Sequence, residues 1–218
     1  MPLRFCWTTF DVTSLLPEDW HEDITAVAAE AEFGDFPRTP VLSREAADVR
    51  YITRGRVHAE KVQERLPWLY KLYRNEFAEL AVQARKEPIE TAFDDRYGVV
   101  LNVQKGPTMR FECHVDSNPV TGLLFLTDHP TGGGELVVSH DPAAVGVGRL
   151  ERDCSLVRPQ AGQLIIFDGK TYPHYARALL SGQEVRVVAV MNFYTRSWPE
   201  STRPVELNHH LFGDDSED

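Results

Sequence analysis

The chain has 218 residues, of which 42% are hydrophobic and 10% aromatic, enough for one globular domain with a sizeable core, with or without a helical appendage. The formal net charge is −10 and no run of Lys or Arg occurs, so nucleic acids and anionic membrane surfaces are disfavoured as partners. No segment reaches the roughly 18 consecutive apolar residues that a membrane-spanning helix needs.

The N-terminal residues 1–20 contain acidic side chains and lack the charged-then-apolar pattern of a signal peptide, so secretion is not expected. The three cysteines, Cys6, Cys113 and Cys154, are widely spaced and form neither a zinc pattern nor a disulfide framework. Together these features predict a reduced, cytoplasmic location.

Helical signals dominate residues 17–86. Residues 22–33 are rich in Ala and Glu, and residues 58–85 carry apolar side chains close to helical spacing. Pro67 lies inside the second stretch and is expected to kink it or divide it in two. We interpret the apolar stripe as a packing face rather than a surface for a partner, so residues 1–95 are predicted to be a helical segment packed on the core.

The pattern changes from Tyr97 onward, where short apolar runs alternate with clusters of Gly, Pro, Asp and Ser. The predicted strands are residues 99–104, 109–115, 121–127, 135–139, 163–168 and 186–194. This spacing favours a mainly β fold with α-helices, in which a jelly roll of residues 96–200 is covered by the N-terminal helices. Residues 201–218 are expected to form a partly disordered tail, with the acidic residues 213–218 frayed.

The run Met109-Arg-Phe-Glu-Cys-His-Val-Asp116 contains the first candidate metal ligands. Because alternate side chains of a strand share a face, Arg110, Glu112, His114 and Asp116 would point the same way. An imidazole and a carboxylate two residues apart can bind one metal from one side. An isolated His-x-Asp is nevertheless common and usually holds no metal, so a third ligand is needed.

His174, in Tyr172-Pro-His-Tyr-Ala-Arg177, is the best candidate for that ligand because it follows a predicted strand. Two histidines and one carboxylate, with coordination positions left open, suit iron(II) and oxygen chemistry. The other histidines lie in the helical stretch, beside loop residues or near the acidic tail: His21, His58, His129, His140, His209 and His210.

Several motifs occur in a recognisable order along the second half of the chain: Leu101-Asn-Val-Gln-Lys-Gly106, His114-Val-Asp116, Gly133-Gly-Glu-Leu136, Pro159-Gln-Ala-Gly162, His174 and Arg186. In this order they resemble the 2-oxoglutarate/iron(II) dioxygenase superfamily, in the branch that includes the prolyl hydroxylases. The resemblance runs from about Val99 to Tyr194 and leaves the first 95 or so residues uncovered. It implies a double-stranded β-helix, the jelly roll of that superfamily.

The resemblance also implies the cofactors and their ligands. Fe(II) would be held by His114, Asp116 and His174, and 2-oxoglutarate by Arg186 and Asn102, with O2 as the oxidant. Arg186 lies twelve residues beyond His174, slightly further than the family's pattern, so Arg177 remains a competitor for the co-substrate carboxylate. A surface salt bridge is the alternative role of Arg186.

The resemblance further implies the type of reaction. Related halogenases have a small residue where this chain has Asp116, so hydroxylation of an unactivated C–H bond is expected. Arg110, Glu112 and Asn192 are candidate contacts for a small polar metabolite, for example a free amino acid, although Arg110 and Glu112 could instead pair with each other. The alternatives are a prolyl-type hydroxylase of protein side chains, and a cupin-like metal-binding protein or oxygenase without 2-oxoglutarate. The oligomeric state stays open.

Overall fold

The computed structural model describes residues 7–130, 132–182 and 184–212. Its strands are β1 (Trp7–Asp11), β2 (Glu32–Pro37), β3 (Tyr51–Val57), β4 (Ile89–Thr91), β5 (Val99–Lys105), β6 (Val120–Phe125), β7 (Leu136–Ser139), β8 (Cys154–Val157), β9 (Gln163–Phe167), β10 (His174–Ala176) and β11 (Val185–Thr195). Its α-helices are α1 (Trp20–Ala29), α2 (Ala59–Arg65), α3 (Pro67–Arg74), α4 (Glu76–Arg85), α5 (Val147–Leu150) and α6 (Glu206–Phe212). The short 3-10 turns are η1 (Thr13–Leu15), η2 (Asp95–Tyr97) and η3 (Glu200–Thr202).

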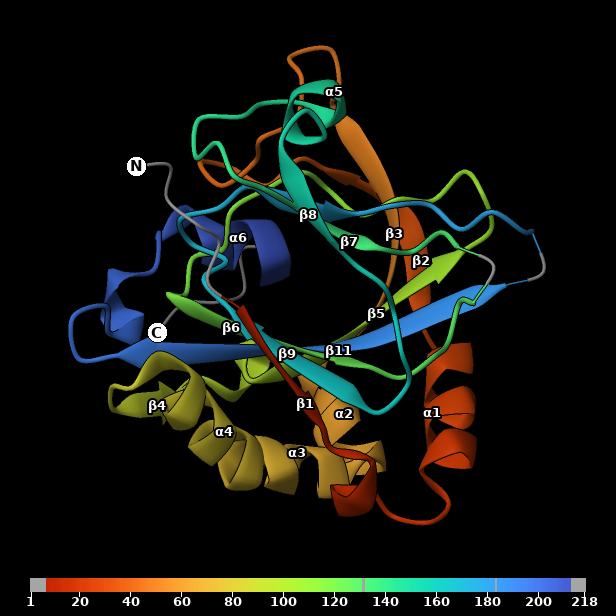
Figure 1. Cartoon of the computed structure of the whole chain (residues 1–218), viewed down its shortest axis with the longest axis vertical. Helices are drawn as coiled ribbons and strands as arrows, with labels where there is room; N and C mark the ends of the chain where they lie inside the picture. Colours follow the sequence, from red (N-terminus) through yellow and green to blue (C-terminus); the bar gives the residue numbers. More distant parts are fainter. Residues whose placement is uncertain (1–6, 131, 183, 213–218) are drawn as a thin grey trace.

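The strands form two antiparallel sheets. The larger has the order β1-β9-β6-β11-β5-β3-β2, with β4 also paired to β11, and the smaller has the order β10-β7-β8. In Figure 1 the small sheet lies above the large one, and helices α1 to α4 lie on the opposite side of the large sheet. The predicted mainly β architecture with packing helices is therefore what the structure shows.

Each central strand of the large sheet sends alternate side chains into two different cores. On β6, Leu124 packs with the helices, whereas Leu123 and Phe125 pack with the small sheet. On β9, Ile166 and Ile165 divide in the same way. This two-sided burial explains why the strands read as nearly continuous apolar runs, since a sheet covered on both faces needs apolar residues at every position.

The helical stretch packs on the sheet, as the apolar stripe predicted. Leu66, Leu69 and Phe77 belong to the same buried cluster as Leu101 of β5. Pro67 divides the stretch as expected, because it stands at the first turn of α3, where its missing N–H costs no hydrogen bond. None of the helices in the described part of the chain is long and apolar enough to cross a membrane.

Two predictions about secondary structure in the N-terminal half were wrong. Residues 1–95 are not wholly helical, because β1, β2, β3 and β4 all belong to the large sheet. The helix expected over residues 22–33 ends at Ala29, and Phe33 pairs with Gly55 of β3 instead. Sheet pairing thus overrides the helical tendency of the Ala- and Glu-rich sequence at its C-terminal end.

Residues 109–115, predicted as a strand, are extended but form no ladder. They meet their neighbours at isolated bridges, where His114 faces Ser43 on one side and His174 on the other. Because these neighbours pair with the run only at single residues, no regular strand forms.

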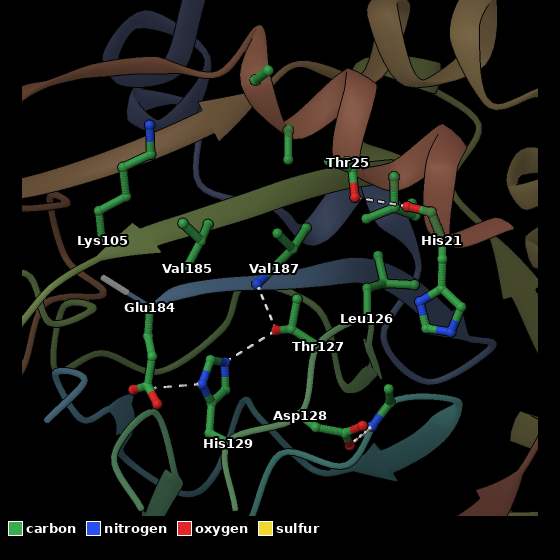
Figure 2. Close-up of a pocket in the computed structure, with 14 residues that line it drawn as sticks. His21, Thr25, Lys105, Leu126, Thr127, Asp128, His129, Glu184, Val185 and Val187 are labelled. Atoms are coloured by element: carbon green, nitrogen blue, oxygen red, sulfur yellow. Dashed lines mark hydrogen bonds and ion pairs between the residues drawn. The ribbon is translucent and has the colours of Figure 1, made fainter. Parts of the chain in front are cut away.

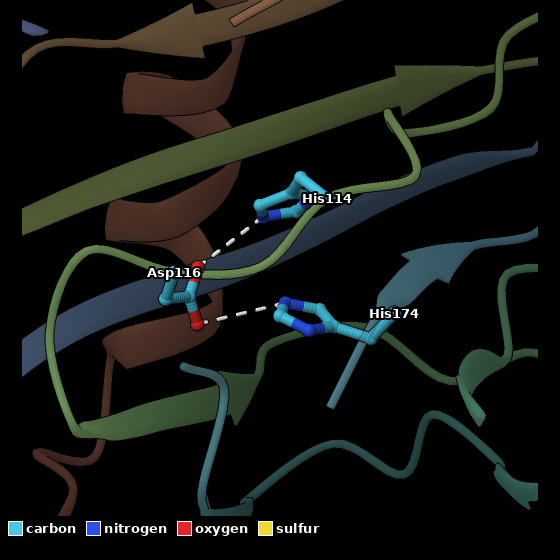
Figure 3. Close-up of side chains that lie close together, drawn as sticks. All are labelled: His114, Asp116 and His174. Carbon is cyan, nitrogen blue, oxygen red and sulfur yellow. Dashed lines mark ion pairs between the residues drawn. The ribbon is translucent and has the colours of Figure 1, made fainter. Parts of the chain in front are cut away.

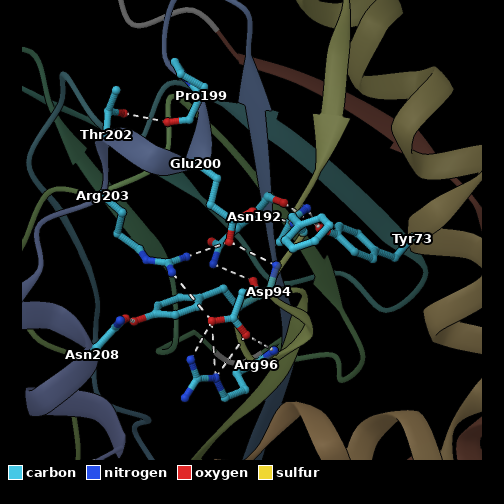
Figure 4. A network of polar contacts seen from close by, with 12 residues as sticks. Tyr73, Asp94, Arg96, Asn192, Pro199, Glu200, Thr202, Arg203 and Asn208 are labelled. Carbon is cyan, nitrogen blue, oxygen red and sulfur yellow. Dashed lines mark hydrogen bonds and ion pairs between the residues drawn. The ribbon is translucent and has the colours of Figure 1, made fainter. Parts of the chain in front are cut away.

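The C-terminal segment packs against the end of the sheet through a polar network (Figure 4). Tyr97 donates a hydrogen bond of 2.6 Å to the side chain of Asn208, and the guanidinium carbon of Arg203 lies 3.4 Å from the centre of the Tyr97 ring. Arg203 also pairs with Glu200 at 2.7 Å. Part of the predicted tail is therefore ordered, while residues 213–218 lie outside the described residues.

Truncation of Phe77 tests the packing of α4. Phe77 is fully buried, so Phe77→Ala should lower the free energy of unfolding by about 3–5 kcal/mol through lost contacts and a cavity. Val82 of the same helix is 39% exposed, and Val82→Ala should change it by only about 0.5 kcal/mol. Urea unfolding followed by circular dichroism measures both values. Equal effects of the two variants would contradict a packing role for this face.

Candidate metal centre

Three side chains from two separate segments converge between the sheets. His114 and Asp116 lie on the segment between β5 and β6, and His174 is the first residue of β10 (Figure 3). The Nε2 atom of His114 lies 3.2 Å from Oδ1 of Asp116, and Nε2 of His174 lies 3.5 Å from Oδ2. One ligand atom from each residue lies within 4.8 Å of the others, and among the described residues no other group of His, Cys, Asp and Glu meets that condition.

The backbone fixes this convergence. The N–H of His114 donates to the carbonyl of His174 at 3.0 Å, and the N–H of His174 donates to the carbonyl of His114 at 2.9 Å. The N–H of Asp116 donates to the carbonyl of Gly169 at 2.8 Å. Two segments about 60 residues apart in the sequence are thereby held in one register at the site.

Hydrogen bonds also set the tautomers of the two imidazoles. Nδ1 of His114 lies 2.7 Å from the carbonyl oxygen of Glu112, and Nδ1 of His174 lies 2.9 Å from that of Tyr172. A carbonyl oxygen can only accept, so each Nδ1 carries a proton, and Nε2, the nitrogen that faces Asp116, is the atom left for a metal. Such an arrangement orients histidines for metal binding, and its two nitrogens and one carboxylate fit iron(II).

Burial alone would lower the pKa of His114, but the hydrogen bond and charge of Asp116 outweigh it and raise that pKa. For the other two side chains, electrostatics favour the forms that bind metal. Burial lowers the pKa of His174 to about 4, so the imidazole is neutral at pH 7. Burial alone would raise the pKa of Asp116, but the nearby His174 and hydrogen bonds from His114 and Thr121 outweigh it and lower that pKa. The Thr121 hydroxyl donates to Oδ2 of Asp116 and accepts from the Asn118 amide at 3.0 Å. The carboxylate is therefore ionised and oriented.

A small cavity of about 40 Å³, called here the inner cavity, joins the three ligands to Arg186 and Asn102. Arg186 is only 2% exposed and donates to the side-chain oxygen of Gln104 at 2.8 Å. Among the described residues, its Nε atom has no hydrogen-bond partner. Burial lowers the pKa of Arg186 to about 10, with Glu135 opposing the shift, so the guanidinium still carries its charge at pH 7.

A second cavity of about 140 Å³, called here the outer cavity, meets the inner one at His114 and Asp116. The two share five lining residues: Asn102, Phe111, His114, Asp116 and Val190. The outer cavity extends from there to β3, η2 and α6.

The structure places the other predicted site residues differently. Arg110 is not directed into either cavity, because its guanidinium forms a bidentate pair with the buried carboxylate of Glu45 at 2.6 and 2.8 Å. This corrects the expectation that Arg110 faces the metal, and it also excludes a pair with Glu112. The carboxylate of Glu112 accepts two hydrogen bonds of 2.8 Å from Thr39, although Glu112 does line the outer cavity.

Asn192 and Arg177 have partners of their own. The side-chain amide of Asn192 donates to the carbonyl of Tyr97 at 2.7 Å, and Asn192 also lines the outer cavity. Arg177 pairs with Glu151 at 2.8 Å and lines neither cavity.

Sequence reasoning missed three residues that shape the site. Gln104 holds Arg186, and the alternation of β5 could have revealed it, since Gln104 shares a face with Asn102. Thr121 binds Asp116, but a threonine in an apolar strand gives no signal of its own. Gly169 lies so close to Asp116 that a Cβ atom added there would stand 1.9 Å from Oδ2.

A larger cavity of about 540 Å³ lies away from the ligands, beside α1 (Figure 2). Its walls include His21, Thr25, Lys105 and His129, and Nε2 of His129 lies 3.1 Å from the Thr127 hydroxyl. None of the three converging ligands lines it. Cavity size therefore does not mark the candidate site in this fold.

Solved structures are similar to this chain over most of its length, whereas no protein-family model matches it and no curated protein matches it in sequence. The epimerase SnoN from nogalamycin biosynthesis, described as non-heme and alpha-ketoglutarate dependent, has a TM-score of 0.65 and 16% identity, covering 99% of this chain and 86% of that one. An oxidoreductase of the 2OG-Fe(II) oxygenase family from Burkholderia pseudomallei has a TM-score of 0.60 and 15% identity, covering 91% and 89%.

A third similar structure is a prolyl hydroxylase from Trichoplax adhaerens in complex with a peptide fragment of hypoxia inducible factor. Its TM-score is 0.58 and its identity 12%, with 88% of this chain and 84% of that one covered. At such identities the likeness shows the fold, and function rests on the residues of the site.

Removal of one ligand should abolish metal binding. His114→Ala, Asp116→Ala and His174→Ala should each lower the affinity for Fe(II) or Co(II) at least about tenfold while the protein stays folded, because an open site has few ligands to spare. Anaerobic titration followed by absorbance of the Co(II) form measures the affinity. His140→Ala is the control, since His140 pairs with Asp153 at the surface. Native affinity in any ligand variant would remove that residue from the set.

Gly169→Ala tests the close approach to Asp116. The new methyl group would collide with the carboxylate, so metal affinity should fall roughly tenfold or more as the ligand is displaced. Gly148→Ala is a matched control, because a Cβ atom there meets no atom within 4 Å. The same Co(II) titration compares them, and equal affinities would show that the carboxylate moves without cost.

Proposed function

We propose that this chain, which has the fold of the 2-oxoglutarate/iron(II) oxygenases, is itself an iron(II)- and 2-oxoglutarate-dependent oxygenase that hydroxylates an unactivated C–H bond of a small polar molecule. One observation supports it most strongly. A buried, incompletely partnered Arg186 lines the same inner cavity as His114, Asp116 and His174. We further propose that the two sheets enclosing this cavity are the double-stranded β-helix of that superfamily.

The environment of Arg186 favours it as the clamp for the co-substrate. A buried cation is costly unless an anion and hydrogen bonds compensate it, and Gln104 supplies only one hydrogen bond. The far carboxylate of 2-oxoglutarate would supply the missing anion and further hydrogen bonds to the Arg186 guanidinium. Arg177, the competitor, is already neutralised by Glu151 at a partly exposed position.

His114, Asp116 and His174 would hold the iron by their Nε2 and carboxylate atoms, in the tautomers that the carbonyls of Glu112 and Tyr172 impose. When bound, iron(II) with 2-oxoglutarate and O2 supplies the oxidising power for C–H hydroxylation. Leu123, Leu136 and Val188 line the inner cavity and exclude water from it. Because Asp116 would occupy a coordination position with its carboxylate, hydroxylation rather than halogenation is proposed.

Two alternatives are weaker on structural grounds. A cupin-like protein that does not use 2-oxoglutarate has no need for a buried cation such as Arg186 beside the metal. A hydroxylase of protein side chains, like the peptide-bound prolyl hydroxylase, needs room for an extended chain, whereas the outer cavity measures only about 140 Å³ and has Leu207 and Leu211 of α6 in its wall.

Binding of 2-oxoglutarate to the anaerobic, iron-loaded protein is the direct test. A weak visible charge-transfer band should appear on titration, and aerobic turnover should release succinate. Arg186→Ala should weaken 2-oxoglutarate binding by about 2–5 kcal/mol and spare iron binding, because it removes a buried charged partner. Arg177→Ala is the control and should bind normally. If only Arg177→Ala weakens binding, the clamp is assigned to the wrong arginine.

A further inference from the structure

Two arginines of β3 line the outer cavity together with two of the candidate metal ligands. Arg56 is paired in register with Asn102 of β5, which lines both cavities, so Arg56 lies on the same face of the sheet as Asn102. Arg54 precedes it by two residues and shares that face by strand alternation. Both Arg54 and Arg56 line the outer cavity, together with His114 and Asp116.

Neither guanidinium forms an ion pair within the described part of the chain, although Glu112 acts on Arg54 electrostatically and Glu32, the register partner of Arg56 on β2, acts on Arg56. Arg54 is only 8% exposed, and Nε of Arg54 and Nε of Arg56 are buried without a hydrogen bond. No ion pair within 4 Å involves either residue among the described residues. The recorded contact of Arg54 is with the ring of Phe36, whose centre lies 4.5 Å from the guanidinium carbon.

Other arginines near the site are neutralised by acids. Arg110 pairs with Glu45, Arg177 with Glu151, and Arg96 with Asp94 at 2.7 Å. Burying an arginine without such a partner costs folding free energy, because the charge loses its hydration. Two neighbouring arginines without an ion-pair partner on one cavity wall indicate a binding site for an anionic ligand.

Arg54 and Arg56 place two positive charges in the wall of the outer cavity, which also contains the acids Glu112 and Asp116. Burial, and then the charge of Arg54, lower the pKa of Arg56 to about 10, so it is still protonated at pH 7. Burial lowers the pKa of Arg54, and the negative charge of Glu112 opposes this shift. Both carboxylate oxygens of Glu112 already accept hydrogen bonds from Thr39. The two guanidinium groups would attract an anion to this part of the cavity wall.

We propose that Arg54 and Arg56 form an anion subsite that binds a phosphate or carboxylate group of the substrate. The inference rests on the proposed oxygenase function and deepens it, because it defines the substrate as a small anionic molecule. Guanidinium groups bind such oxyanions with paired hydrogen bonds, which fix orientation as well as position. An anion held at β3 places the rest of the molecule toward His114 and Asp116, and this role replaces the one expected of Arg110.

The test uses inorganic phosphate and acetate as separate probes on the folded, metal-free chain, with calorimetric titration as the readout. The native chain should bind at least one probe, and the preferred probe distinguishes a phosphate-bearing substrate from a carboxylate-bearing one. Arg54→Gln and Arg56→Gln should each weaken that binding at least about tenfold, since each removes a charged hydrogen-bond donor. Arg56→Lys keeps the charge and should retain part of the affinity.

Two controls locate the effect. Arg149→Gln alters an exposed arginine paired with Asp141 and should leave anion binding unchanged. Arg186→Gln should also leave phosphate binding unchanged, because Arg186 lines only the inner of the two cavities. The proposal is overturned if the native chain binds neither probe at millimolar concentration, if both β3 variants bind like the native chain, or if Arg186→Gln alone abolishes binding.

A separate measurement keeps this inference distinguishable from the proposed function. Arg54→Gln and Arg56→Gln should retain the charge-transfer band with iron(II) and 2-oxoglutarate, because neither residue lines the inner cavity. If the native chain shows no such band, the oxygenase function is contradicted. The anion subsite is still supported by its own titration in that case. Loss of the band in the β3 variants alone would show that these arginines hold 2-oxoglutarate instead, and would overturn the subsite for a substrate.

Discussion

The reciprocal backbone hydrogen bonds between His114 and His174 are the constraint on which the candidate site depends. They join a segment that has no regular secondary structure to the first residue of β10, and each ligand thereby fixes the position of the other. On the side of this segment away from His174, the backbone N–H of Arg44 donates to the carbonyl of Cys113 at 2.7 Å. The backbone N–H of Cys113 donates to the carboxylate of Glu45 at 2.7 Å. The metal-binding segment is therefore clamped from both sides without belonging to a sheet.

The distribution of partners separates structural charges from those available to ligands. Glu45 and Arg110 satisfy each other and hold the loop before β3 against the metal-binding segment. Arg54 and Arg186 are buried, and Arg54, Arg56 and Arg186 each have a buried Nε atom without a hydrogen bond in the described part of the chain. Because an uncompensated buried charge is unfavourable, it is retained where a ligand supplies the missing anion. Arg186 lines the inner cavity, and Arg54 and Arg56 line the outer one.

The sequence singled out the three side chains that the structure brings together, because their pattern is local. His114 and Asp116 stand two residues apart, and His174 and Arg186 follow in an order that resembles a known superfamily. It predicted Arg110 poorly because the alternation argument assumed a regular strand, and the segment is held by Glu45 from a distant loop. The N-terminal strands were missed for a related reason. Residues such as Phe33 become part of a strand only through pairing with β3, which a single sequence does not show.

The position of β1 has a consequence for how the molecule is made. Trp7 to Asp11 pair with Phe167 to Gln163, so the first described strand completes its sheet edge only after some 160 residues have followed it. Such long-range pairing slows folding, because the chain must close a large loop before the contacts can stabilise it. On the ribosome, β1 emerges first and waits for β9, and the His174 ligand emerges later still. His114 and Asp116 can therefore meet His174 only after most of the chain has been synthesised.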